Sequence, residues 1–420
     1  MINYIAFLTN KRYNLGMITS FSVENYHSIR EEVVLDLRIP KTAPDLPRFR
    51  RSSSKPDIRL PSVVVLIGPN GSGKTTLLRA LIDTARIASS ALPTEENNPI
   101  NTFVPFLSPE TRGKPTRFSV EFEAEWLALG EARQLFHYEL AVGRDASGFQ
   151  GHSFHYEVLS YFPKGRPRRL FERRGPGEPI YVSSEFGLKL NDDRLKAVRK
   201  DASLIATLAL LNVPLAMRIV KDMQLVLWSS NIVFHSKWEP PTKTVIQLFE
   251  GNPELKVWAR KHIQSSDLGI QGFDISNSLQ GEKVVFFKHH GLDAPILLHF
   301  ESSGTKRLFH LLPQVGFALN SGVPAVLDEV DGDLHMDIAG EILDWFRLQE
   351  SNPHDAQLFV TSHNVGLLDD LEKEEVFIVE KDGNGATQVH GAQDVRGLRR
   401  DARLYPKYRA GVLGGLPKLG

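Results

Sequence analysis

The spacing of apolar and polar positions changes several times along the chain, and each change predicts a different element. Alternation at 18–24 and 32–37 predicts two strands that form a hairpin. A continuous apolar run at 60–67 predicts a buried strand, and helical spacing follows from 74 to about 90. The stretch 40–59 is rich in Pro, Arg, Ser and Lys, so we expect an exposed loop there.

The middle of the chain combines strand and helix signals. Three alternating runs between 117 and 160 predict antiparallel strands, and the basic residues that follow, including Arg173 and Arg174, are expected in solvated turns. Helical spacing then predicts helices over 203–211, 214–227 and 244–266, before two strands at 283–288 and 294–300.

Strands and helices alternate in the last third of the chain. The pattern predicts a helix at 308–319, a strand at 324–329, a helix at 338–348, and strands at 357–363 and 375–380. Such alternation is typical of a parallel sheet with helices on its faces. The sequence therefore predicts an α/β fold.

A glycine-rich turn, Gly68-Pro-Asn-Gly-Ser-Gly-Lys-Thr-Thr76, joins the first buried strand to its helix. Its spacing matches the phosphate-binding loop G-x-x-x-x-G-K-[ST], and strand and helix lie where that motif requires them. Lys74 is expected to reach the β- and γ-phosphates, and Thr75 to bring its hydroxyl to Mg²⁺. ATP and Mg²⁺ are therefore the expected ligands. The residues expected to bind the nucleotide are Gly68, Asn70, Gly71, Ser72, Gly73, Lys74, Thr75 and Thr76.

Two carboxylates, Asp328 and Glu329, follow a later apolar strand. Asp328 fits a Walker B motif, in which it shares Mg²⁺ with Thr75, and Glu329 fits the general base for the attacking water. His363 ends the next apolar strand, and we expect it to bind the γ-phosphate or to position the water. The predicted catalytic residues are therefore Glu329, His363 and Lys74, and the predicted metal ligands are Thr75 and Asp328.

Small residues open the helix that precedes these carboxylates. Ser302, Ser303 and Gly304 leave backbone N–H groups free for an anion at a helix N-terminus. The segment lies where ATP-binding-cassette (ABC) and SMC-type ATPases carry their Leu-Ser-Gly-Gly-Gln signature. It resembles that signature at Ser303 and Gly304 and departs from it at its other positions.

Composition narrows the classes of function. The 420 residues hold 50 Lys and Arg against 50 Asp and Glu, so no global charge draws the chain to nucleic acid or a membrane. The absence of cysteine excludes disulfides, Cys-ligated zinc, iron–sulfur clusters and cysteine nucleophiles. No signal-peptide pattern and no apolar run of about 18 residues or more is present, so we expect a soluble, cytoplasmic protein without a membrane partner.

Several motifs occur together: the run 18–30, Glu301-Ser-Ser-Gly-Thr-Lys-Arg-Leu308, Leu327-Asp-Glu-Val-Asp-Gly-Asp-Leu-His335, Thr361-Ser-His363 and the tail 404–417. Together they resemble the RloA-type ATPases, which are SMC-like ATPases of prokaryotic antiphage systems. Related proteins are the AbiL-type and PARIS ATPase subunits and the ATPase half of OLD nucleases. The resemblance covers almost all of residues 17–417. It implies a P-loop NTPase of the ABC/SMC-head type with a mixed strand-and-helix insertion.

The resemblance also implies a division of the chain and a set of partners. In such a family Ser303 and Gly304 of a second subunit cover the nucleotide, and Asp331 communicates across the interface. The expected function is ATP hydrolysis by a homo-oligomer that senses a phage-encoded trigger and regulates a separate effector, a TOPRIM-type nuclease encoded nearby. The expected parts are an N-terminal extension (1–16), the first part of the ATPase head (17–116), an insertion offering a partner or sensor surface (117–290) and the second part of the head (291–420).

Other functions compete with this one. Asp331 and Asp333 resemble the Asp-x-Asp of a TOPRIM nuclease, but about ninety residues after Glu329 leave too little chain for a nuclease domain. A DNA repair or chromosome-handling ATPase of RecF or SMC type is the main alternative, with DNA as a candidate partner, although no heptad pattern predicts long coiled-coil arms. A transporter subunit fits less well, because the insertion is large and the signature departs from the transporter form.

Overall fold

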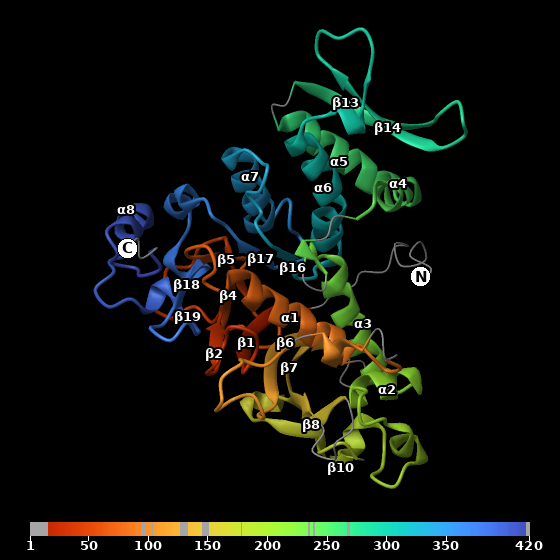
Figure 1. The fold of residues 1–420 in the computed structure, drawn as a ribbon, viewed down its shortest axis with the longest axis vertical. Coiled ribbons are helices and arrows are strands. Elements are labelled where there is room, and N and C mark those ends of the chain that lie inside the picture. Colours follow the sequence, from red (N-terminus) through yellow and green to blue (C-terminus); the bar gives the residue numbers. More distant parts are fainter. Residues whose placement is uncertain are drawn as a thin grey trace.

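The computed structural model describes residues 16–93, 98–102, 104–126, 133–144, 151–177, 179–233, 236–237, 240–266 and 269–416. Except for Gly16, the predicted N-terminal extension lies outside these residues. Helix α1 (Lys74–Ala88) runs between two sheets (Figure 1) and contacts β1 and β6 of one and β17 of the other. The loop that precedes α1 therefore lies at the centre of the molecule.

A five-stranded sheet forms the core around the glycine-rich loop. Its first four strands in space are parallel, and the fifth, β19, is antiparallel to β18. All residues of β5 and β17 are buried, which explains their continuous apolar runs. The predicted α/β class is confirmed. The spatial order is β16 (Ala325–Leu327), β17 (Leu358–Thr361), β5 (Val63–Ile67), β18 (Val376–Lys381) and β19 (Thr387–Gly391).

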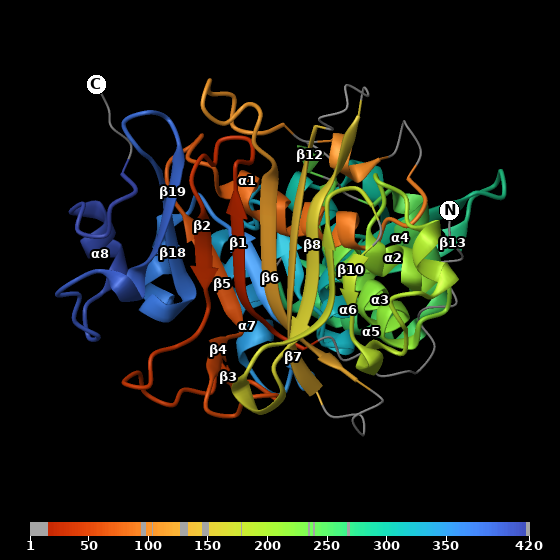
Figure 2. The ribbon, with the colours of Figure 1, turned by 90° about the horizontal axis from the view of Figure 1, so that it is seen from below.

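The second sheet is antiparallel and has seven strands, which lie side by side in Figure 2. β1 pairs with β6, so that Phe21 lies opposite Val120. The sheet therefore continues through residue 117, where the predicted division begins the insertion; that division stays a prediction. The spatial order is β10 (Pro179–Val182), β9 (Arg168–Arg174), β8 (His152–Tyr161), β7 (Arg133–Arg144), β6 (Thr116–Glu125), β1 (Ile18–Glu24) and β2 (Val33–Asp36).

A smaller unit of helices and strands stands above the core in Figure 1. The helix expected at 244–266 is two helices, α4 (Thr242–Gly251) and α5 (Pro253–Ser265), because Asn252 caps a new helix that begins at a proline. Both pack on α6 (Ser303–Ser321). A three-stranded sheet completes the unit, with β13 (Ile270–Asn277), β14 (Lys283–His289) and β15 (Ile296–Leu297).

The remaining elements connect these units. Among the described helices none is long and apolar enough by itself to cross a membrane, and one bent pair, α2 with the start of α3, passes that test by length and composition only. The elements are α2 (Leu204–Leu210), α3 (Pro214–Trp228), α7 (Met336–Arg347), α8 (Leu404–Arg409), and the short strands β3 (Phe49–Arg51), β4 (Arg59–Pro61), β11 (Ile232–Val233) and β12 (Ser236–Lys237).

Two polar segments differ from the sequence prediction. The stretch 40–59 is not simply an exposed loop, because β3 pairs with β4 and Arg59 is buried, donating to the carbonyls of Pro40 and Ala43 at 2.9 and 2.8 Å. Arg173 lies fully buried in β9 and pairs with Glu157 at 3.4 Å, although a solvated turn was expected. In both places carbonyl or carboxylate oxygens accept hydrogen bonds from the buried guanidinium group, so a prediction from charge alone wrongly puts these residues in solvent.

Candidate functional site

The phosphate-binding loop has a backbone that requires glycine at three predicted positions. Gly71 and Gly73 have φ angles of 75° and 111°, in the left-handed region that other residues avoid. A Cβ atom at Gly68 would lie 2.0 Å from the carbonyl oxygen of Val379. The Ser72 hydroxyl is buried and has no hydrogen-bond partner among the described residues. A phosphate oxygen fits that orphaned donor, so the loop suits the expected nucleotide.

Lys74 is buried inside the loop it follows. Its Nζ donates to the carbonyl oxygens of Gly68 at 2.8 Å and Pro69 at 3.1 Å. Burial lowers the pKa of Lys74, and the nearby carboxylates of Asp328 and Glu329 oppose that shift. A phosphate group would be a stronger acceptor for this ammonium group than the two carbonyls.

The loop is held from behind by a residue that the sequence did not indicate. Thr387 on β19 donates its hydroxyl to the carbonyl of Ser72 at 2.8 Å and lies 2.9 Å from the Ser28 hydroxyl. Lys381 donates to the same Thr387 oxygen at 2.9 Å. A Cβ at Gly73 would lie 2.2 Å from this hydroxyl. These partners are far apart in the sequence, and no local motif marks Thr387.

The two predicted metal ligands meet at the start of α1. The Thr75 hydroxyl lies 3.0 Å from each carboxylate oxygen of Asp328, and Thr361 donates to the same carboxylate at 2.6 Å. The Asn231 side chain fixes the backbone of Asp328 with two hydrogen bonds. Its Oδ1 accepts from the Asp328 N–H at 2.7 Å, and its Nδ2 donates to the Asp328 carbonyl at 3.0 Å. A hydroxyl and a carboxylate oriented in this way fit Mg²⁺, which prefers oxygen ligands.

Asn231 and Thr361 were not predicted to belong to the site. The segment before β11 runs beside β16 as an additional edge, with a parallel bridge between Ser230 and Val326. Gln314 of α6 donates to the Ser230 carbonyl at 2.9 Å. The sequence signal at Thr361 was only its place in the Thr-Ser-His run, and at Asn231 there was none.

Glu329 and His363 lie together at the open side of the site. The Glu329 carboxylate is 3.2 Å from His363 Nε2, and their side chains are 32% and 39% exposed. Glu329 has a φ of 48°, and its N–H donates to the Thr361 hydroxyl at 2.7 Å. Water can therefore reach a carboxylate whose backbone is fixed beside the Asp328 carboxylate.

Asp331 is engaged within its own chain. Its carboxylate accepts from the backbone N–H groups of His363 at 3.1 Å and Asn364 at 2.8 Å. These bonds hold the segment that carries His363 against the loop after β16. The predicted role of Asp331 across an interface stays a prediction.

The signature-like segment lies on the other side of that loop. Ser302 caps α6 by accepting from the N–H of Thr305 at 3.1 Å, and Ser303 is exposed. A Cβ at Gly304 would be 2.8 Å from the carbonyl of Asp333. One turn later Arg307 donates to the Glu329 carbonyl at 2.8 Å. The structure thus places Ser303 and Gly304 beside the loop that carries Glu329 in the same chain.

Two further residues predicted to bind the nucleotide lie in the phosphate loop and in the first turn of α1. Asn70 is exposed at the tip of the loop, and Thr76 is half-buried in the first turn of α1. The structure brings Lys74, Thr75, Asp328, Glu329 and His363 into one site. The parallel core, the phosphate loop and the carboxylates after β16 define a P-loop NTPase fold.

Within that class the family can be stated. Residues 63–369 match the family described as "AAA domain, putative AbiEii toxin, Type IV TA system", and the chain belongs to this family. A comparison with curated proteins finds no match.

Three solved structures to which the chain is similar are SMC heads. An SMC head domain from Thermotoga maritima is 14% identical, with 89% of this chain and 98% of that chain covered and a TM-score of 0.41. An Smc head bound to the C-winged helix domain of ScpA is 14% identical, with 89% and 97% covered and a TM-score of 0.45. An Smc head with an extended coiled coil bound to the C-terminal domain of ScpA, derived from Pyrococcus furiosus, is 12% identical, with 94% and 98% covered and a TM-score of 0.45.

Proposed function

We propose that this chain is an ATP-hydrolysing subunit of an antiphage system that regulates a separate effector. The observation that carries the enzymatic part is the linkage of Thr75, Asp328 and Thr361, with the Glu329–His363 pair beside it. A structural P-loop would need neither an exposed carboxylate nor a histidine within 3.2 Å of it.

The residues divide the chemistry among themselves. Glu329 takes the proton of the attacking water, because its carboxylate is open to solvent while its backbone is fixed. His363 orients Glu329 and the γ-phosphate, and Lys74 neutralises charge that develops on the phosphate oxygens. Thr75 and Asp328 would hold Mg²⁺, which supplies further neutralisation when bound.

The site is completed by a second copy of the chain. Ser303 is exposed at the N-terminus of a 19-residue helix, where free N–H groups favour an anion. In a symmetric pair this end of α6 would cover nucleotide held by the partner's phosphate loop. The loop after β16, which carries Asp331, approaches Gly304 of this end through the carbonyl of Asp333. Composite sites therefore make oligomerisation part of catalysis.

The antiphage role is supported by the family and by the resemblance to RloA-type ATPases. In this role a phage-encoded trigger acts on the ATPase, which controls an effector such as a TOPRIM-type nuclease encoded nearby. Co-purification with the product of the neighbouring gene, followed by mass determination, tests this part; a chain that stays alone with and without ATP would contradict it.

The enzymatic part is tested by Glu329→Gln with Glu110→Gln as an exposed control. We expect Glu329→Gln to bind ATP normally while phosphate release falls by about 10²–10⁴-fold, because only the proton acceptor is lost. Glu110→Gln should behave like the wild type. Unchanged turnover in Glu329→Gln would rule out Glu329 as the base.

One observation favours a DNA-handling ATPase as the second candidate. Arg112, Lys114 and Arg144 line one cavity with His152, where the central strands β6, β7 and β8 of the antiparallel sheet begin or end. No carboxylate within the described part of the chain forms an ion pair with these three cations. Fluorescence anisotropy with a labelled duplex, at two salt concentrations, tests this function, since phosphate contacts weaken as salt rises.

A further inference from the structure

The turn that joins β1 to β2 has a backbone that residues other than glycine rarely adopt. Asn25 and His27 have φ angles of 53° and 48°, in the left-handed region. Tyr26 and Ile29 are fully buried and exchange two backbone hydrogen bonds, at 2.8 and 2.7 Å, which close the turn. Backbone of this kind persists only where the surrounding contacts fix it. The contacts of the turn therefore indicate what it holds in place.

The buried side chain of Asn25 holds the segment that leads into β6. Its Nδ2 donates to the carbonyl oxygens of Thr111, Lys114 and Pro115, at 3.1, 2.9 and 3.3 Å. Its Oδ1 accepts from the N–H of Phe106 at 3.0 Å. Both polar atoms of the amide are therefore used, and they fix the turn to this segment.

The next residues of the turn reach the phosphate loop. The Ser28 carbonyl accepts from the N–H of Thr387 at 2.7 Å, and the hydroxyls of these two residues lie 2.9 Å apart. Thr387 donates to the Ser72 carbonyl, and its Oγ1 would lie 2.2 Å from a Cβ at Gly73. The turn therefore contacts the back of the phosphate loop through one residue, Thr387.

The same turn also holds the helix that begins at the phosphate loop. The Tyr26 hydroxyl donates to the Asp83 carboxylate of α1 at 2.7 Å, and both side chains are buried. The loop and the start of α1 carry the N–H groups and the Lys74 ammonium group that are expected at the phosphates. A small displacement of either part would misplace these donors.

We propose that Asn25 is a positioning residue for ATP, which acts through Ser28 and Thr387 and not by contact with the nucleotide. This inference rests on the proposed function. Without the amide the phosphate loop can adopt other shapes, so ATP should bind more weakly, while Glu329 keeps its own supports. We therefore expect a higher KM for ATP and an almost unchanged turnover at saturating ATP. A mere loss of folded protein would lower turnover and leave KM unchanged.

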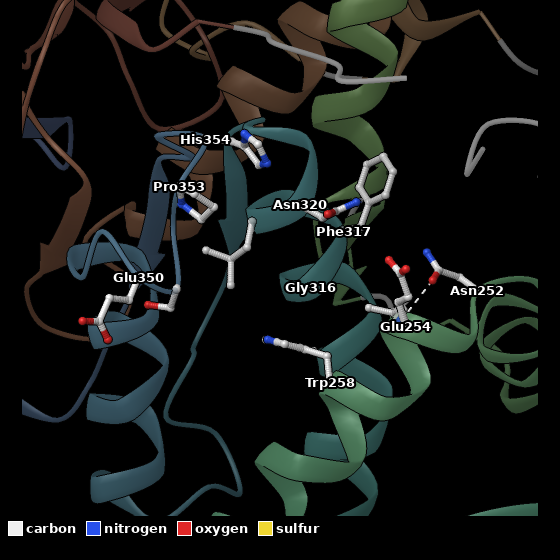
Figure 3. Close-up of a pocket in the computed structure, with 12 residues that line it drawn as sticks. Asn252, Glu254, Trp258, Gly316, Phe317, Asn320, Glu350, Pro353 and His354 are labelled. Carbon is white, nitrogen blue, oxygen red and sulfur yellow. Dashed lines mark hydrogen bonds between the residues drawn. The ribbon is translucent and has the colours of Figure 1, made fainter. Parts of the chain in front are cut away.

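The test compares Asn25→Gly with Asn352→Gly. Glycine accepts the left-handed backbone of residue 25, so the first variant removes the amide without adding strain. Asn352 is a matched control, because it is fully buried and its Nδ2 donates to the carbonyls of Phe346 and Ala356 at 2.8 Å each. It belongs to the segment 350–354, which contributes to the lining of a different cavity, of about 300 Å³, beside α5 and α6 (Figure 3).

Isothermal titration with ATP and steady-state phosphate release are measured on both variants at a temperature where both are folded. We expect both variants to be less stable than the wild type. Only Asn25→Gly should bind ATP about three- to tenfold more weakly, with its KM raised by the same factor. An unchanged KM in Asn25→Gly, or an equal rise in both variants, would overturn the proposal. A wild type that binds no ATP would instead refute the proposed function, and this inference with it.

A double-mutant cycle tests the route through Thr387. Because Asn25→Gly and Thr387→Val remove the same support, the double variant should bind ATP no more than about twofold more weakly than the weaker single variant. Losses of affinity that multiply would overturn the route. Ser28→Ala leaves the amide of Asn25 intact and serves where Asn25→Gly does not fold. Its ATP affinity should fall about two- to threefold, and an unchanged affinity would overturn the proposal.

Discussion

The phosphate loop and the N-terminus of α6 both offer N–H groups to an anion, but their surroundings differ. Around the loop, Gly68 lies against the Val379 carbonyl and Ser72 is held by Thr387, so the chain itself fixes the binding surface. At α6, Ser303 faces solvent. One half of the site is therefore formed within a single chain, and we propose that the other half serves a neighbouring copy. The variants below separate these halves.

The largest effect is expected within the loop, from Lys74→Ala. Removing the buried ammonium group leaves the γ-phosphate without its main charged donor, so ATP affinity should fall by about ten- to a hundredfold and turnover should disappear. Isothermal titration with ATP measures the affinity. The exposed Lys41→Ala serves as the control, and a Lys74→Ala protein with wild-type affinity would contradict the assignment of the loop.

The variant Ser303→Arg tests the half of the proposed site that lies at the N-terminus of α6. A large cation at this exposed position should block closure over a partner's nucleotide, while the loop of the same chain is untouched. We expect ATP affinity of the isolated chain to stay unchanged and phosphate release to fall by about a hundredfold. Ser184→Arg, also at an exposed serine, is the matched control. A loss of affinity equal to that of Lys74→Ala would show that both halves act in one chain.

Thr387→Val tests the support behind the loop. Valine keeps the shape but removes the hydroxyl that binds the Ser72 carbonyl, so we expect the free energy of unfolding to fall by about 1–3 kcal/mol and ATP affinity to weaken several-fold. Thr207→Val, which loses a buried hydroxyl bond to the Ser203 carbonyl in α2, is the control. Thr207→Val should lower the free energy of unfolding to a similar extent and leave ATP affinity unchanged. Equal losses of ATP affinity in both variants would argue against a local role of Thr387 at the loop.

The smallest effect on nucleotide binding is expected from Asp222→Asn. Asp222 lies in α3, outside both halves of the proposed site. Burial raises the pKa of Asp222 to about 6, although Arg218 opposes the shift. Because the folded state holds this proton more tightly than the unfolded chain, the stability it contributes is present below about pH 4 and is lost as pH rises through about 6.

The asparagine variant cannot ionise, so its stability relative to the wild type should increase by up to about 3 kcal/mol between pH 4 and pH 7. Urea unfolding at several pH values measures this difference, and ATP affinity should not change. Parallel stability curves for the two proteins would show that Asp222 titrates normally.

Local patterns were sufficient for much of the core. The apolar run of β5 followed by glycines and Lys74 predicted strand, loop and helix together, and Asp328 and His363 were found from their places after buried strands. These features depend on residues that are neighbours in sequence. The α/β fold could therefore be predicted, and the roles assigned to the site residues stay predictions.

Features that depend on distant partners could not be predicted. Thr387, Asn231 and Thr361 support the site through bonds to residues far away in the chain, and each is an ordinary polar residue in its own segment. The pairing of β1 with β6 is also non-local, so the strands after residue 117 were recognised but not assigned to the same sheet as β1. Arg59 was taken as exposed because its carbonyl partners could not be seen in the sequence.

The most direct test of a composite site is complementation between two inactive variants. Lys74→Ala and Ser303→Arg are co-expressed with different tags, and the mixed complex is isolated by two affinity steps. One of its two sites then combines an intact loop with an intact α6 end, so phosphate release should return to about half of the wild-type rate per complex. If each chain hydrolyses ATP on its own, the mixed complex will remain as inactive as its parents, and the proposal of a shared site will be wrong.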